Sequence, residues 1–109
     1  MPSIPAEDYH AEELADALAE RGFTHLRVRR RGALLTIESG DKRDAFAHAR
    51  LRRDGVHLWI LEMPTHSATW ERTPFRQHID RQLELLCTEL SWALAPRPAI
   101  PMRTSGRKY

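Results

Sequence analysis

Hydrophobic residues along the chain follow a helical spacing first, an alternating spacing next, and a helical spacing again near the end. Over residues 6–21, Leu14 and Leu18 lie on a narrow apolar stripe, and acidic side chains occupy most other positions. This pattern predicts an amphipathic helix. Gly22 suits the left-handed position that ends a helix, and Phe23 then packs back onto the last turn.

The alternating region begins with a predicted hairpin. Residues 24–30 and 33–38 pair around a turn at Arg31-Gly32. In this register aliphatic residues lie on one face, and Arg27 and Arg29 lie on the other. Such regular alternation is typical of an antiparallel pair with one buried face and one exposed face.

Residues 44–63 predict a second hairpin, folded about Asp54-Gly55, a pair that two-residue turns prefer. The register puts aliphatic residues and alanines on one face and cationic and aromatic residues on the other. Glu62 falls on the aliphatic face, which is a local conflict and indicates a bulge or an early strand end. The cationic-aromatic face carries Phe46, Arg50, Arg52, Trp59 and Met63.

Residues 64–74 lack a clear period, and Trp70 among them marks either a short fifth strand or a loop held by its tryptophan. Thr73-Pro74 is typical of a helix start, with threonine as the cap and proline in the first turn. Apolar residues then recur at spacings of three and four as far as Leu90. This predicts a second helix that ends near Ser91.

The predicted order of elements is α-β-β-β-β-α. It indicates an α+β fold with a four-stranded antiparallel meander, or a five-stranded one if the segment around Trp70 pairs, and with the N-terminal and C-terminal helices on one face. Residues 1–94 form this single domain, because the chain is long enough for one core but not for two. Residues 95–109 contain three prolines and four basic side chains, which predicts a flexible basic tail.

Composition places few limits on function, but it does indicate the cellular compartment in which we expect the protein. The formal net charge is +2, and four of the positive charges lie in the tail, so residues 1–94 are slightly acidic overall. No signal peptide is visible, and no apolar stretch approaches the roughly 20 residues of a membrane span. The single cysteine, Cys87, cannot form an internal disulfide. We therefore expect a cytoplasmic protein without a membrane partner.

The predicted sheet leaves one face uncovered, and arginine and aromatic side chains gather on it. Both tight turns of a meander lie at the same end of the sheet, so arginines of the two hairpins approach each other there. Guanidinium groups neutralise phosphates, and exposed rings stack on bases. The sequence therefore predicts a non-enzymatic binding module for nucleic acid (RNA or single-stranded DNA) or another polyanion. The candidate binding residues are Arg27, Arg29, Arg30, Arg31, Arg50, Arg52, Arg53, Phe46, Trp59 and Met63.

A protein partner is the alternative interpretation, either a second copy or a complex in which this chain is an antitoxin-like or immunity-like subunit. The fourth strand ends the meander unless residues 68–72 cover it, and a free strand edge invites strand addition. Trp59, Leu61 and Met63 form an apolar strip rimmed by arginine. That composition is typical of interfaces.

Sequence motifs for catalysis or for cofactor binding are missing. There is no Walker loop, no G-x-G-x-x-G and no G-x-S-x-G, and the six histidines show no zinc-binding spacing, so neither a cofactor nor a metal is expected. Cys87 lies on an apolar helical stripe, which suits a buried hydrophobe. The remaining enzymatic hypothesis is a metal-free ribonuclease that uses His48 and His57 on the cationic face, with His66-Ser67 nearby, for acid–base catalysis.

Overall fold

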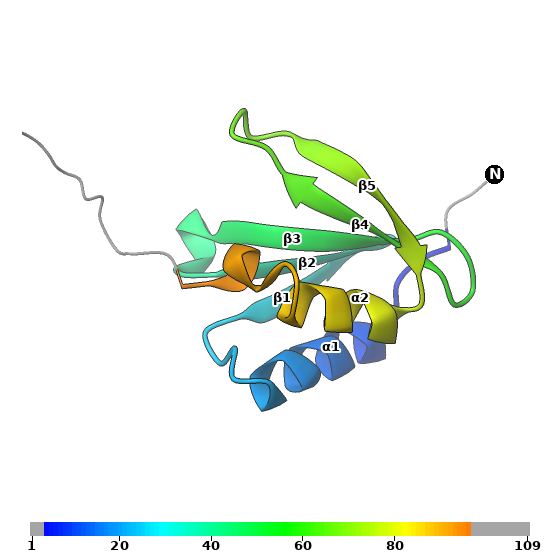
Figure 1. Cartoon of the computed structure of the whole chain (residues 1–109), viewed down its shortest axis with the longest axis horizontal. Helices are drawn as coiled ribbons and strands as arrows, with labels where there is room; N and C mark the ends of the chain where they lie inside the picture. Colours follow the sequence, from blue (N-terminus) through cyan, green and yellow to red (C-terminus); the bar gives the residue numbers. More distant parts are fainter. Residues whose placement is uncertain (1–3, 97–109) are drawn as a thin grey trace, which may run out of the picture.

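The computed structural model describes residues 4–96 as one antiparallel sheet with two helices on one of its faces (Figure 1). The five strands follow the sequence order β1-β2-β3-β4-β5. This confirms the α+β meander, with the fifth strand present. The elements are α1 (Asp8–Glu20), β1 (Arg27–Arg31), β2 (Leu34–Ser39), η1 (Lys42–Asp44), β3 (Phe46–Arg53), β4 (Trp59–Pro64), β5 (Trp70–Gln77), α2 (Ile79–Cys87) and η2 (Ser91–Leu94). The predicted tail lies outside the described residues apart from Ala95 and Pro96.

Helix α1 ends as its sequence predicts. Gly22 has a φ of 96°, and the Phe23 amide donates to the Leu18 carbonyl at 3.0 Å, which closes the last turn. Phe23 packs against the hydrophobic core from this position. After this turn the chain continues into β1.

The first hairpin turns one residue later than predicted, between Arg31 and Leu34. Arg27 therefore pairs with Glu38 and not with Thr36. A shift of two residues leaves every side chain on its predicted face, because side chains alternate with a period of two. His25 is not paired with Glu38 as its predicted register implied, and its Nε2 instead bonds the Leu94 carbonyl at 2.7 Å.

The second hairpin corrects the predicted register. Its loop spans five residues, 54–58, so that Leu51 pairs with Leu61 instead of Leu58. This shift is three residues, and an odd shift turns the whole of β4 over. Trp59 and Leu61 thereby enter the core at 2% and 0% exposure, and Glu62 moves to the opposite face, which removes the conflict at that position. Burial of a tryptophan and a leucine outweighs the local preference of Asp54-Gly55 for a tight turn.

The segment predicted as irregular contains strand β5, and the predicted helix start within it is wrong. Thr73-Pro74 lies inside β5, where the pairing with β4 shifts register between Ile60 and Glu62. The Thr73 hydroxyl donates to the Leu61 carbonyl at 2.7 Å across this bulge. Proline is tolerated there because a bulge needs no ladder hydrogen bond from its nitrogen. Helix α2 begins only at Ile79.

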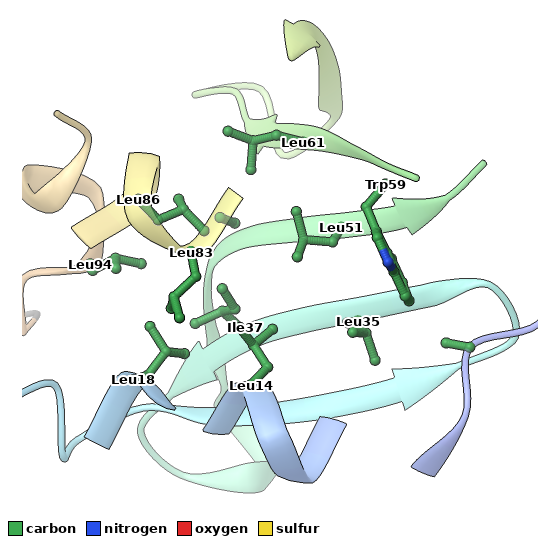
Figure 2. Packing of buried hydrophobic residues seen from close by; sticks show 12 residues of the cluster. Leu14, Leu18, Leu35, Ile37, Leu51, Trp59, Leu61, Leu83, Leu86 and Leu94 are labelled. Carbon is green, nitrogen blue, oxygen red and sulfur yellow. The ribbon is translucent and has the colours of Figure 1, made fainter. Parts of the chain in front are cut away.

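The hydrophobic core lies between the helices and one face of the sheet (Figure 2). Polar side chains are buried beside it as well. Among them, Gln82 of α2 is 0% exposed and donates to the carbonyls of Trp59 at 2.8 Å and Phe75 at 2.9 Å. Among residues 4–96, no helix has the length and apolar character needed to cross a membrane. The largest core side chains are Leu14, Leu18, Leu35, Ile37, Leu51, Trp59, Leu61, Leu83, Leu86 and Leu94.

Candidate functional site

The sheet face opposite the helices, here called the open face, carries arginine on alternate strands. One cross-strand row runs from β1 to β5 through Arg29, Thr36, Arg50, Glu62 and Arg72. The next row runs through Arg31, Leu34, Arg52, Ile60 and Arg76. In both rows arginine occupies β1, β3 and β5, and non-basic residues occupy β2 and β4. We call these two sets of three side chains the arginine rows.

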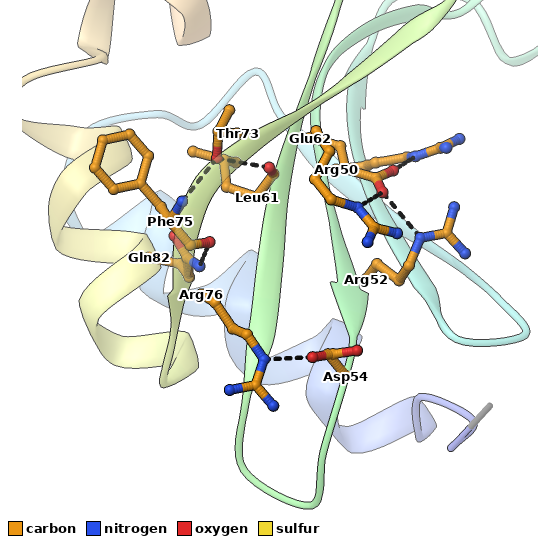
Figure 3. A network of polar contacts seen from close by, with 10 residues as sticks. Arg50, Arg52, Asp54, Leu61, Glu62, Thr73, Phe75, Arg76 and Gln82 are labelled. Atoms are coloured by element: carbon orange, nitrogen blue, oxygen red, sulfur yellow. Dashed lines mark hydrogen bonds and ion pairs between the residues drawn. The ribbon is translucent and has the colours of Figure 1, made fainter. Parts of the chain in front are cut away.

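Two buried glutamates hold the arginines in place. Glu62 is 3% exposed, and its two oxygens accept from Arg50 Nε at 2.5 Å and Arg52 Nε at 2.9 Å (Figure 3). Glu38 is 5% exposed and accepts from Arg27 Nε at 3.1 Å and Arg29 Nε at 3.2 Å. Each carboxylate therefore binds two guanidinium groups through their Nε atoms.

The charge state of Glu62 follows from these contacts. Burial alone would raise the pKa of this carboxyl, but the hydrogen bonds from Arg52 and Arg50, together with their charges, outweigh it. The net result is a pKa below the ordinary value of 4.5, so Glu62 is ionised at neutral pH. Its negative charge fixes the direction of two arginines that would otherwise repel each other.

The outer ends of Arg29 and Arg52 remain available, whereas the side chain of Arg50 is only 17% exposed. Among the described residues, the terminal Nη groups of Arg29, Arg50 and Arg52 make no hydrogen bond. The side chain of Arg29 is 52% exposed and that of Arg52 is 33% exposed. A guanidinium held at Nε presents its other N–H donors to whatever approaches from solvent.

Trp70 is the tryptophan of the open face, and sequence reasoning missed it. The Arg50 guanidinium lies over its ring, 4.4 Å from the ring centroid, a cation–π contact. Trp70 stands two residues before Arg72, and this alternation is the only sequence signal that could have found it. The predicted aromatic residue of this face, Trp59, is instead buried on the helix side.

Four more of the candidate binding residues lie on the helix side of the sheet, and for Phe46 and Met63 this contradicts the prediction. Arg30 Nε donates to Asp8 Oδ1 of α1 at 2.6 Å, and Arg53 Nη1 donates to the Pro5 carbonyl at 2.8 Å. Both arginines tie the N-terminal segment to the sheet. Met63 packs against the core, and the Phe46 ring contacts His48, so neither lies beside the arginines as predicted.

The structure removes the features on which the interface alternative depended. Strand β4 pairs with β3 on one side and with β5 on the other, so its edge is not free. Of the predicted apolar strip, Trp59 and Leu61 are buried, and Met63 is partly buried against the core. The outer strands of the sheet are β1 and β5.

The two histidines of the ribonuclease hypothesis do not lie together on the cationic face, so that predicted placement is also wrong. His48 is 2% exposed and lies on the helix side, at a bulge where β3 has one residue more than β2. Its Nδ1 bonds the Ala93 carbonyl at 2.8 Å, and its Nε2 bonds Ser39 Oγ at 2.7 Å. His57 belongs to the 54–58 loop, where its ring stacks on His78 at 6.1 Å between centroids. Burial raises the pKa of the Cys87 thiol, which does not suit a nucleophile either.

A groove of about 1110 Å³ borders the open face. It lies where β3 and β4 separate, because these strands pair only over residues 50–53 of β3. Figure 1 shows the β4–β5 hairpin bending away from β3 at this end. Four aromatic side chains are among the lining residues: Phe46, Trp70, Phe75 and Trp92.

Within residues 4–96, histidine, cysteine and carboxylate side chains form no group of three that could hold a metal ion. Comparison of the chain with protein families, with curated proteins and with solved structures found no match. Its function has to be inferred from its own residues.

Proposed function

We propose that this protein binds single-stranded nucleic acid, RNA or DNA, on the open face of its sheet. The observation that carries the proposal is the pair of arginine rows, which place guanidinium groups on every second strand. Strands lie roughly 4.8 Å apart, so neighbouring arginines within a row are about 10 Å apart, and the two rows are about 7 Å apart. The second value is of the order of the distance between successive phosphates in an extended strand.

The charge balance of the open face favours an anionic ligand. Its arginines outnumber the three carboxylates that pair with them, Glu38, Glu62 and Asp54. The excess leaves a net positive surface, which attracts a polyanion and speeds its association.

Fixed arginines bind phosphate with a smaller loss of conformational entropy than free ones. Long side chains lose rotamer freedom when they are immobilised, a loss of up to about 2 kcal/mol for arginine. Glu38 and Glu62 already hold Arg29, Arg50 and Arg52 in defined positions in the folded protein. Trp70 beside Arg50 adds a ring at the edge of this surface, as expected for a face that also contacts bases.

The experiment measures binding of a fluorescein-labelled RNA of about 12 nucleotides, and of the DNA strand of the same sequence, across a salt series. The test variant is R29Q/R52Q, which leaves Glu38 with Arg27 and Glu62 with Arg50. The matched control is R21Q/R81Q, which removes two positive charges from exposed positions on the helix side. Both variants have the same net charge.

We expect the wild-type affinity to fall steeply with salt. In R29Q/R52Q the slope of log affinity against log salt should decrease by about 1.4, which corresponds to two lost phosphate contacts. The control should keep the wild-type slope. Absence of binding at about 50 mM salt, or equal losses in the two variants, would overturn the proposal.

A further inference from the structure

The groove beside the open face is an opening in the sheet. Residues 46–49 of β3 pair with β2, but no strand pairs with them on their other side. The β4–β5 hairpin leaves the plane of the sheet there, and η2, which packs against β3, contributes Trp92 and Ala93 to the lining. The volume, about 1110 Å³, slightly exceeds the roughly 300–1,000 Å³ typical of ligand sites.

Exposed aromatic side chains line this groove, and the elements that carry them are attached to the rest of the fold. Trp92 of η2 is 70% exposed and Phe75 of β5 is 40% exposed. Two histidines hold η2 on the sheet: His25 bonds the Leu94 carbonyl, and His48 bonds the Ala93 carbonyl. Trp92 is therefore held outward by a firmly attached segment. Exposed apolar residues that share one contiguous patch mark interaction sites, whereas scattered single ones are normal on a surface, and Trp92 and Phe75 line the same groove.

We propose that this groove receives unpaired bases of the same strand whose phosphates lie on the arginine rows, an inference that rests on the proposed function. Trp70 connects the two surfaces. Its ring lies against the Arg50 guanidinium, and it also lines the groove. A strand bound along the arginines thus passes directly beside an aromatic opening. Bases stack readily on aromatic rings in single-stranded recognition, whereas bases paired in a duplex cannot leave their stack to do so.

Glu71 is the polar residue of the groove that best suits a base edge. Its exposed carboxylate lies among the lining residues, whereas the hydroxyls of Thr65 and Thr69 bond each other and that of Thr73 bonds the Leu61 carbonyl. A carboxylate accepts from the amino groups of bases. The adjoining positive charge of the open face selects a ligand that carries phosphate. The groove and the arginine rows together define a site for an unpaired nucleotide segment.

The experiment distinguishes binding of the bases from binding of the phosphates. One ligand is the labelled RNA of about 12 nucleotides, another is an abasic strand of the same length, and the third is the duplex of the same sequence. The test variant is Trp92→Ala, and the control is Tyr9→Ala, which removes an aromatic side chain that is 53% exposed on α1. Because Trp92 is largely exposed, its removal should leave the fold intact, which thermal unfolding can verify. Quenching of Trp92 fluorescence, identified by comparison with Trp92→Phe, gives a second measurement in the otherwise unchanged protein.

We expect the wild type to bind the RNA roughly 5- to 100-fold more tightly than the abasic strand. Trp92→Ala should reduce this ratio several-fold and leave the salt dependence unchanged, and Tyr9→Ala should change neither. Equal binding of RNA and abasic strand would overturn the base-binding groove and leave the proposed function standing. Tighter binding of the duplex would overturn both, because the proposed function is binding of a single strand. No binding of any of these ligands would overturn the proposed function itself. Trp92 emission that changes with protein concentration alone would assign the groove to a second copy and would also overturn the inference.

Discussion

Glu62 shows how a single buried side chain organises the open face. Its carboxylate is almost fully removed from water and is compensated only by arginines. Glu62→Gln removes the negative charge and keeps the shape, so two guanidinium groups are left close together without their counter-charge. We expect the free energy of unfolding at neutral pH to decrease by about 3 kcal/mol. Urea unfolding measures it, and Glu84→Gln, at an exposed ion pair with Arg21, should cost no more than about 1 kcal/mol.

The same residue predicts how stability depends on pH. The pKa of Glu62 is lower in the folded protein than its ordinary value of 4.5, so the unfolded chain binds a proton more readily. Its contribution to stability is therefore complete well above pH 4.5 and is lost as the pH falls through the lower folded pKa. The difference in unfolding free energy between wild type and Glu62→Gln should shrink in that acidic range. A difference that stayed constant down to the acid-unfolded state would contradict the role of this charge.

At the level of single residues, the sequence predicts side-chain faces only as well as it predicts the turn. Arg27, Arg29, Arg50 and Arg52 lie on the open face as expected, because they precede the turns and keep their alternation with β2. Trp59 follows a turn whose length was wrong by three residues, so it was assigned to the wrong face. Asp54-Gly55 favours a tight turn locally. The longer loop is preferred because only that loop allows Trp59 and Leu61 to be buried. That burial depends on helices distant in sequence.

At the level of elements, Gln82 attaches α2 to the β4–β5 hairpin. Its amide group donates to the Trp59 and Phe75 carbonyls, one on each strand, in a place that water does not reach. Gln82→Leu fills similar space but removes the donor that the side chain supplies to both carbonyls. We expect the unfolding free energy to decrease by about 1–3 kcal/mol.

The control for this substitution is the neighbouring exposed position on the same helix. Arg81→Gln should change the unfolding free energy by less than about 0.5 kcal/mol. Amide hydrogen exchange adds a local measurement, because Gln82→Leu should accelerate exchange in β5 before it affects β1. Equal stability of the two variants would show that α2 is held by its apolar stripe alone.

Elements with complete local signals were predictable, and those with conflicting signals were not. Helix α1 has an apolar stripe and a glycine at its end, so both its existence and its C-terminal end could be predicted. Strand β5 contains Thr73-Pro74, which has the composition of a helix cap but lies at a bulge in the sheet. The bulge is stabilised by a bond from Thr73 to β4, which no local pattern reveals. The predicted helix start was therefore wrong, although the later apolar stripe of α2 was recognised.

At the level of the whole molecule, the outer surfaces of the helix layer and of the sheet carry opposite charges. Acidic side chains cover the solvent side of α1, and arginines cover the open face of the sheet. A molecule with this separation orients itself in the field of a polyanion and approaches it with the sheet first. The arginine rows could not be found from sequence, because they need β5 in place to supply Arg72 and Arg76. The separation of acidic and basic segments along the chain could be seen in the sequence, but the recurrence of arginine on alternate strands could not.

The last prediction concerns the charges of residues 97–109, whose sequence continues from Pro96 at the lining of the groove. If these residues add only electrostatic attraction, replacement of their four basic side chains by glutamine in the full-length chain should weaken RNA binding and reduce the salt slope by up to about 2.8. The ratio between RNA and abasic strand should not change, because every residue assigned to base contact lies within residues 4–96. The control is R21Q/R81Q, which also lowers the net charge but leaves these residues intact. An unchanged salt slope would show that the tail does not touch the nucleic acid. A changed RNA-to-abasic ratio would show instead that the tail takes part in holding the bases. The variant is R97Q/R103Q/R107Q/K108Q.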